Sequence, residues 1–202
     1  SNDAYYNSNT PLLTDNEFDI IKEYAETKYD QNDVLQQIGA PVNRNKVDLP
    51  FRMPSMDKIK PDTNVLSKWK SKYKGPYVLS CKLDGVSGLY TTQNGIPKLY
   101  TRGDGKIGQD ISHLIPYLKL PKVKDIAVRG EFIIKKNVFD QKYQQQFANP
   151  RNMVSGIINS KQVDKKIHDL DFIAYELIQP SMKPSSQMKK LQDLSFPVVQ
   201  HV

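Results

Sequence analysis

The spacing of apolar side chains along the chain changes from a helical period to strict alternation near residue 76. Ahead of that point, Thr14-Asp15-Asn16-Glu17 has the pattern of a capping box, and apolar residues follow it at helical spacing. We therefore expect a helix over 15–28, preceded by the end of an earlier helix at Tyr5-Tyr6. These residues would form a small helical unit over 1–29.

A proline-rich stretch separates this unit from the rest of the chain. Prolines stand at positions 41, 50, 54 and 61, which predicts a loop-rich connection over 30–62. Asp62 is then expected to cap a short amphipathic helix that carries Trp69 and Tyr73 on its apolar side and ends at Gly75-Pro76.

The remaining residues, 63–202, alternate in the manner of β-strands with helices between them. Asn94-Gly95 is a strong hairpin signal, and the nearly continuous apolar run 126–134 is typical of a central strand. We expect strands at 77–83, 86–92, 98–101, 126–134 and 172–178, with a last short strand at Val198-Val199. Helices are expected at 137–146, 150–161 and 184–194. Strands joined by hairpins with helices interspersed indicate an α+β fold with antiparallel sheets.

Composition narrows the class of protein further. The chain has 29 basic and 22 acidic residues, a net charge of +7 that favours a polyanionic partner such as nucleic acid. Its single cysteine, Cys81, excludes an internal disulfide framework. Because no apolar run approaches the roughly 20 residues needed to span a bilayer and no secretory signal is present, we expect an intracellular protein with no membrane partner.

Four polar clusters interrupt the predicted strands: Lys82-Leu83-Asp84-Gly85, Thr101-Arg102-Gly103-Asp104-Gly105, Arg129-Gly130-Glu131 and Phe147-Ala148-Asn149-Pro150-Arg151-Asn152. Each one alone has an ordinary structural explanation as a turn, a salt bridge within a strand or a helix cap. An arginine and a glutamate inside the most apolar strand are the hardest to explain in that way, since unpaired buried charges cost several kcal/mol. Lys82 would stand at a strand end with its amine partly desolvated, where a lysine can become a nucleophile.

The order and spacing of these four clusters resemble the adenylation domain of NAD-dependent DNA ligases. Residues 1–29 are similar to the small helical cap that precedes that domain in this family and recognises nicotinamide mononucleotide. The resemblance therefore covers essentially the whole chain.

The resemblance implies specific roles. Lys82 would attack the α-phosphate of NAD, release nicotinamide mononucleotide and keep AMP as a phosphoramide, with Asp84 and Arg102 lining the site. Glu131 would bind the AMP ribose, Tyr175 would stack on adenine, and Arg151 would contact the nucleotide phosphate or nicked DNA. The resemblance also implies Mg2+, with no protein residue assigned as its ligand. The other expected nucleotide contacts are Ser55, Met56, Ser80 and Cys81 in the domain and Tyr5, Tyr6, Asp15, Phe18 and Asp19 in the cap.

Four positions depart from the bacterial pattern. Tyr6 and Phe18 replace a histidine and a tyrosine of the cap, Ser80 replaces a glutamate that reads adenine, and Asn159 replaces an arginine that contacts DNA. The later lysine-bearing motifs and DNA-binding modules of the family are also absent from the sequence. We therefore expect a divergent, viral-type ligase fragment that does not seal nicks alone, with its C-terminal part supplied in trans or lost by truncation.

Two alternatives remain open on the sequence alone. One is a catalytically silent nucleic-acid-binding module that keeps the fold and the basic surface. The other is an ATP-dependent nucleotidyltransferase with the same fold and a vestigial cap.

Overall fold

The computed structural model describes residues 21, 24, 46–56, 58–60, 64–160 and 162–202. Apart from Ile21 and Tyr24, the predicted cap, with Tyr5, Tyr6, Asp15, Phe18 and Asp19, therefore lies outside the described residues, as does the predicted helix cap Asp62.

A four-stranded antiparallel sheet forms the centre of the described part, in the order β3-β2-β5-β6. Its strands are β2 (Val86–Thr91), β3 (Lys98–Thr101), β5 (Ala127–Ile134) and β6 (Leu170–Gln179). β2 and β3 form the hairpin that Asn94-Gly95 predicts, through a 3-10 turn η1 (Gln93–Gly95) in which both residues have positive φ. β5 lies between β2 and β6, so its predicted central position is confirmed.

A two-stranded sheet extends the fold. Here β1 (Lys46–Asp48) pairs with β4 (Ile107–Gln109). Two 3-10 helices, η2 (Ser112–Tyr117) and η3 (Lys165–Asp169), complete the connections. The sequence pattern predicted none of these four elements, because each is too short to show a period.

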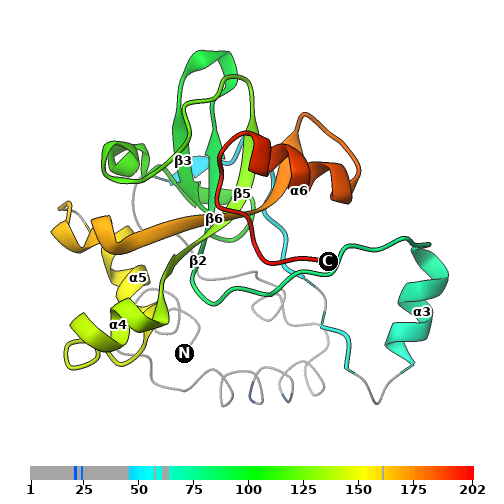
Figure 1. The fold of residues 1–202 in the computed structure, drawn as a ribbon, viewed down its shortest axis with the longest axis horizontal. Coiled ribbons are helices and arrows are strands. Elements are labelled where there is room, and N and C mark those ends of the chain that lie inside the picture. The colour runs from blue at the N-terminus through cyan, green and yellow to red at the C-terminus, as the bar shows by residue number, and fades with distance from the viewer. Residues whose placement is uncertain (1–20, 22–23, 25–45, 57, 61–63, 161) are drawn as a thin grey trace.

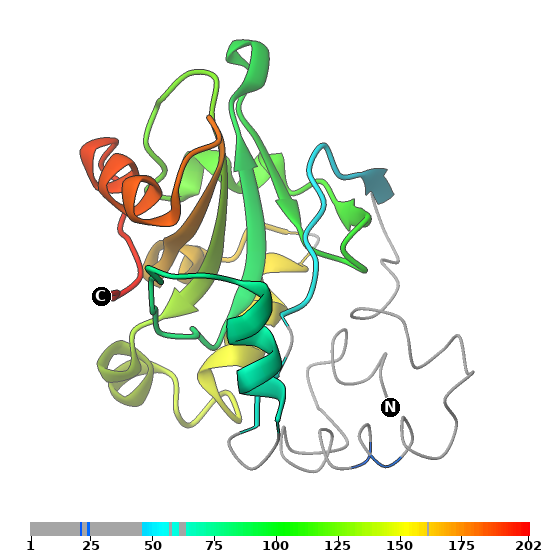
Figure 2. The same cartoon turned by 90° about the vertical axis from the view of Figure 1, so that its right-hand side faces the viewer.

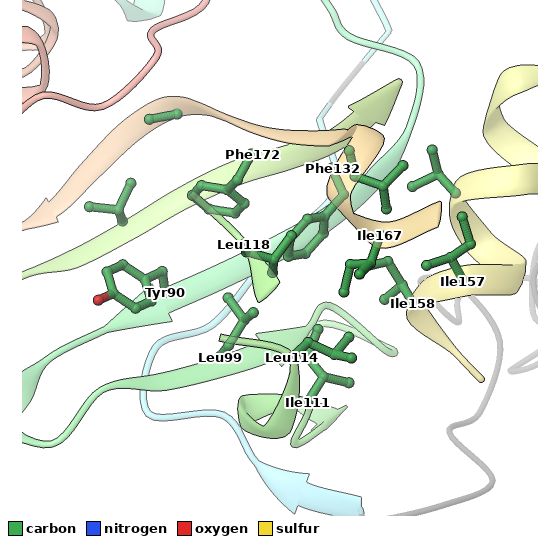
Figure 3. Packing of buried hydrophobic residues seen from close by; sticks show 14 of the residues in the cluster. Tyr90, Leu99, Ile111, Leu114, Leu118, Phe132, Ile157, Ile158, Ile167 and Phe172 are labelled. Carbon is green, nitrogen blue, oxygen red and sulfur yellow. The ribbon is translucent and has the colours of Figure 1, made fainter. Parts of the chain in front are cut away.

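One face of the large sheet is apolar and carries the core. The core packs side chains of the sheet against α5 (Pro150–Ile158) and η2, and Phe132 and Phe172 pack together with ring centroids 5.1 Å apart (Figure 3). α6 (Pro184–Asp193) packs beside β6, and α4 (Lys136–Lys142) follows β5 (Figure 1). Since β5 directs Val128, Phe132 and Ile134 into this core, Arg129 and Glu131 point to the opposite face.

Three predicted elements are shorter than expected. The helices predicted over 137–146 and 150–161 end at Lys142 and Ile158, so Asn159 lies at the C-cap of α5. The predicted strand at Val198-Val199 is a single parallel bridge between Val198 and Ala174.

The predicted strand 77–83 is wrong. The structure has only an isolated antiparallel bridge between Ser80 and His201, flanked by backbone hydrogen bonds between Leu79 and Val202 and from Cys81 to Gln200. The side chain of Leu79 is 68% exposed, so the apolar run Tyr77–Leu79 is not a buried strand. We call residues 73–81 the linker, because they lead from α3 (Val65–Lys72) to the Lys82 turn.

Candidate nucleotide site on the polar face of the sheet

The polar face of the sheet centres on Glu131. Its side chain is 8% exposed and accepts a hydrogen bond of 2.8 Å from the Ser87 hydroxyl, which lies directly opposite on β2. Burial raises the pKa of the Glu131 carboxyl, and the Ser87 hydroxyl, the charges of Arg151 and Lys82 and the Gly85 N–H oppose this rise. Glu131 is therefore a buried carboxylate on which two cations from separate segments converge.

The charge of Lys82 acts on this carboxylate from the segment that ends at Gly85. A Cβ on Gly85 would overlap the carbonyl oxygen of Phe132 and lie 3.0 Å from the Ile133 side chain, so only glycine lets the turn approach β5 this closely. The turn thus brings the charge of Lys82 beside Glu131. Lys82 itself is exposed, contrary to the burial that the sequence predicted, because the segment before it is a surface linker rather than a core strand.

Arg151 connects the start of α5 to the same turn. Its guanidinium pairs with the Asp84 carboxylate at 3.0 Å. Asn149 caps α5 by accepting a 2.8 Å hydrogen bond from the Asn152 N–H, and Pro150 occupies the first turn. The predicted helix cap is therefore correct, and its effect is to aim Arg151 at the Lys82 turn.

Tyr175 enters the site through a β-bulge. The β5–β6 register moves from Arg129 opposite Glu176 to Gly130 opposite Ala174, which leaves Tyr175 as the extra residue. Burial and the nearby charge of Glu131 raise the pKa of Tyr175 to about 12, while a hydrogen bond with Ser87 and the charge of Arg129 act in the opposite direction. The phenol is therefore neutral near Glu131 throughout the ordinary pH range.

Arg129 anchors another part of the chain over this face. Its guanidinium pairs with Glu176 at 2.5 Å and donates to the carbonyl of Arg52. The next residue, Met53, is 1% exposed and donates a 2.9 Å hydrogen bond to the Gly105 carbonyl. Segment 52–56, which carries the predicted contacts Ser55 and Met56, is thus fixed at two points, to β5 through Arg129 and to the turn after β3 through Gly105. The side chains of Ser55 and Met56 are both exposed.

The Thr-Arg-Gly-Asp-Gly cluster forms a tight turn beside β2. Asp104 accepts hydrogen bonds from the N–H groups of Lys106 and Ile107, and Gly103 and Gly105 have positive φ. The Arg102 N–H donates to the Ser87 carbonyl at 3.2 Å, so Arg102 leaves the sheet next to the Glu131 partner. This motif is a turn whose glycines the backbone requires, and it also places an arginine at the site.

Ten of the predicted site residues lie in the described part of the chain, and the structure brings six of them together. Lys82, Asp84, Glu131, Arg151 and Tyr175 form one connected group. Arg102 is joined to that group through its backbone. Ser80 and Cys81 lie in the linker just ahead of Lys82 and are exposed. The sequence reasoning missed Ser87 and the positioning contacts of Arg129, since the first depends on strand register and the second on a segment 77 residues away in the chain.

Comparison with known proteins shows the family. The family model described as the NAD-dependent DNA ligase adenylation domain matches residues 43–202. This chain belongs to that family.

Relatives named as DNA ligases also match this chain. A DNA ligase of Acanthamoeba polyphaga mimivirus is 46% identical over 98% of this chain and 32% of its own length. Protein 205R of Invertebrate iridescent virus 6 is 44% identical over 86% of the chain and 28% of its own length. A DNA ligase of Clostridioides difficile is 32% identical over 82% and 28% respectively. The chain thus spans about a third or less of the length of these relatives.

Within the described residues, no helix is long and apolar enough to cross a membrane.

Proposed function

We propose that this chain performs the first step of NAD-dependent DNA ligation, the transfer of AMP from NAD to Lys82. The observation that carries the proposal is that the Lys82–Gly85 segment lies against β5 beside the buried Glu131 carboxylate, with Arg151 paired to Asp84 of the same segment, in a chain of this family.

In this step the neutral amine of Lys82 donates its lone pair to the α-phosphorus of NAD. A phosphorus–nitrogen bond forms, and the bond from that phosphorus to the bridging oxygen breaks. Nicotinamide mononucleotide leaves with its phosphate, the attacking nitrogen loses a proton, and AMP stays on the lysine as a phosphoramide. Arg151, with Asp84 fixing its guanidinium, is placed to neutralise phosphate charge near the attacked atom.

The polar face supplies the remaining contacts. Glu131 is held by the Ser87 hydroxyl and the Gly85 N–H, which leaves a carboxylate suited to accept hydrogen bonds from a ribose diol. Tyr175, aimed by its bulge, is the aromatic surface for adenine. Two buried donors, Arg129 Nε and Asn152 Nδ2, have no acceptor among the described residues, which fits a ligand rich in acceptor oxygens.

Magnesium fits this site as an ion carried mainly by phosphates. The described residues include no group of three His, Cys, Asp or Glu side chains that could hold a metal ion. Mg2+ commonly uses one or two carboxylates together with substrate phosphates, and Asp84 and Glu131 are the two carboxylates of the connected group. When bound, it would neutralise charge that develops on the phosphates.

We extend the proposal to the whole protein from its named relatives. The AMP on Lys82 would pass to the 5′-phosphate of a DNA nick, and residues beyond the matched portion would complete sealing, in the same chain or in trans. The cap residues Tyr5, Tyr6, Asp15, Phe18 and Asp19 would bind the nicotinamide mononucleotide half.

Intact-mass measurement tests the first step. The chain is incubated with Mg2+ and either NAD or ATP, beside Lys82→Arg, which keeps the charge near Glu131, and the exposed-lysine control Lys119→Arg. We expect a gain of one AMP with NAD only, lost in Lys82→Arg and retained in Lys119→Arg. A gain with ATP would instead indicate the ATP-dependent class. No gain together with salt-sensitive DNA binding would indicate a silent binding module.

A further inference from the structure

The helix α3 and the linker carry a surface that the nucleotide site does not use. Lysines 68, 70, 72 and 74 stand in or just after α3, and no acidic residue occurs between positions 64 and 83. All four are exposed, and none forms an ion pair with a described carboxylate, although lysines of β3, α4 and η3 do. We call these four residues the lysine row.

The lysine row borders an exposed apolar stripe. α3 has no buried residue, and Val65, Leu66 and Tyr73 are each at least 40% exposed. At 100° per residue, Lys68 and Lys72 lie on one side of this stripe and Lys70 on the other. In Figure 1, α3 stands apart from the sheet at the end of the linker, and Figure 2 views the molecule from that side.

Aromatic contacts fix this surface to the linker. The Trp69 ring lies 5.3 Å from Tyr73 and 5.1 Å from Tyr77, and the Tyr77 hydroxyl donates a 2.6 Å hydrogen bond to the Tyr73 carbonyl. Further along the linker, Leu79 and Cys81 are hydrogen-bonded to residues 200–202. The lysine row is therefore held in a defined position with respect to Lys82, which immediately follows the linker.

We propose that the lysine row of α3 binds the phosphate backbone of duplex DNA beside the nick. This inference rests on the proposed function, from which DNA follows as the partner, and it identifies the lysine row as the surface that binds the DNA. Lys68 and Lys72 are about 6 Å apart along the helix axis, from four residues at 1.5 Å each. Each DNA strand presents a charge about every 3.4 Å of its axis, so the pair spans roughly two phosphates.

The residue type fits the same partner. Lysine contacts phosphate as a compact point charge, whereas the planar fork of arginine adds a fixed geometry that suits bidentate contacts to base edges. A row of lysines therefore suits an enzyme that has to act at nicks in any sequence.

Binding of a fluorescently labelled nicked duplex at a series of salt concentrations tests the proposal. The test variant changes Lys68, Lys70, Lys72 and Lys74 to Gln, which removes the charge and keeps a polar side chain of similar helix propensity. The control changes four other exposed lysines that lack ion pairs in the described part to Gln, so that net charge falls equally: Lys119, Lys122, Lys124 and Lys189. Circular dichroism and thermal unfolding check that both variants are folded.

We expect the lysine-row variant to lose at least about tenfold in affinity near 0.1 M salt. Its slope of log K against log salt should fall by about 0.9 for each lysine that contacts a phosphate, up to about 3.6 for four. The control should bind like the unsubstituted chain. Equal losses in the two variants would show an effect of net charge alone and would overturn the assignment.

Trp69 provides a second readout, because it is the only tryptophan of the chain. Duplex DNA bound at α3 should change its fluorescence, and an unchanged signal at saturating DNA would overturn the proposal. A response to anionic phosphatidylserine vesicles but not to DNA would also overturn it, in favour of a membrane surface. If the chain takes AMP from NAD but binds no duplex, the DNA-binding proposal is wrong and the proposed adenylation stands. If it binds duplex at the lysine row but takes no AMP from NAD, the proposed adenylation is wrong and the DNA-binding surface stands.

Discussion

Replacing Gly85 with alanine tests whether the close approach of the Lys82 turn to β5 is needed for chemistry. The added Cβ would overlap the Phe132 carbonyl oxygen, which belongs to a central strand and cannot move aside as a flexible side chain could. Overpacking of this kind costs about 1–3 kcal/mol, or about 2–12 °C in Tm for a chain of this size. The turn would have to move away from β5, and a shift of about 1 Å at a reacting group can lower its rate about 100-fold.

Gly95→Ala is the matched control. Gly95 has φ of +72° and no atom within 4 Å of an added Cβ, so alanine there brings backbone strain of about 1–2 kcal/mol without a clash. Both variants should therefore lose similar stability by thermal unfolding. Only Gly85→Ala should slow AMP transfer from NAD, measured by intact mass over time. Equal transfer rates in the two variants would refute the argument that the approach of the turn positions Lys82.

Three further outcomes follow from the polar face and its surroundings. Burial raises the folded-state pKa of Glu131, so ionising this carboxyl destabilises the fold. The destabilisation is absent below about pH 4 and grows as pH rises through the raised pKa. Glu131→Gln should therefore be more stable than the unsubstituted chain at pH 7 and equally stable in acid. Urea unfolding at both pH values checks this, and a less stable variant at pH 7 contradicts it. Tyr143 donates a 2.5 Å hydrogen bond to Asp169 and lowers the pKa of that carboxyl. The hydrogen bond therefore stabilises the fold fully above the ordinary carboxyl pKa, and this stabilisation is lost as pH falls through the lowered pKa of Asp169. Tyr143→Phe should therefore cost about 1 kcal/mol at neutral pH and less in acid, and a loss independent of pH would count against this account. Arg129→Lys keeps the charge but loses the guanidinium that donates to the Arg52 carbonyl. It should therefore speed proteolysis within 51–60 and weaken the apparent affinity for NAD more than it lowers the rate at saturating NAD. An unchanged rate of proteolysis would rule out this positioning role.

The sheet was predictable because its strands are rich in apolar residues and the β2–β3 turn carries a strong signal. The β2–β3 hairpin follows from Asn94-Gly95, and the central position of β5 follows from its nearly continuous apolar run. The same kind of signal failed at Tyr77–Leu79, where an apolar run belongs to an exposed linker that pairs only through its backbone with residues 200–202. Local hydrophobicity does not report whether a segment has a core to pack against.

The candidate site was predictable as a set of residues but not as a geometry. Resemblance of the motifs selected Lys82, Glu131 and Arg151, which the fold brings together. The Ser87 contact depends on strand register, and the orientation of Tyr175 depends on a β-bulge that no sequence period reveals. The exposure of Lys82 was unexpected because it follows from the misassigned strand.

The central claim is that AMP becomes bonded to Lys82, and peptide mapping of the chain after reaction with NAD and Mg2+ tests it most directly. Proteolytic fragments are separated under neutral conditions that preserve a phosphoramide, and tandem mass spectrometry then locates the added AMP. The account predicts the label on the fragment that contains Lys82, with the bond at its side-chain nitrogen. AMP attached to a different residue, with Lys82 unmodified, would contradict it.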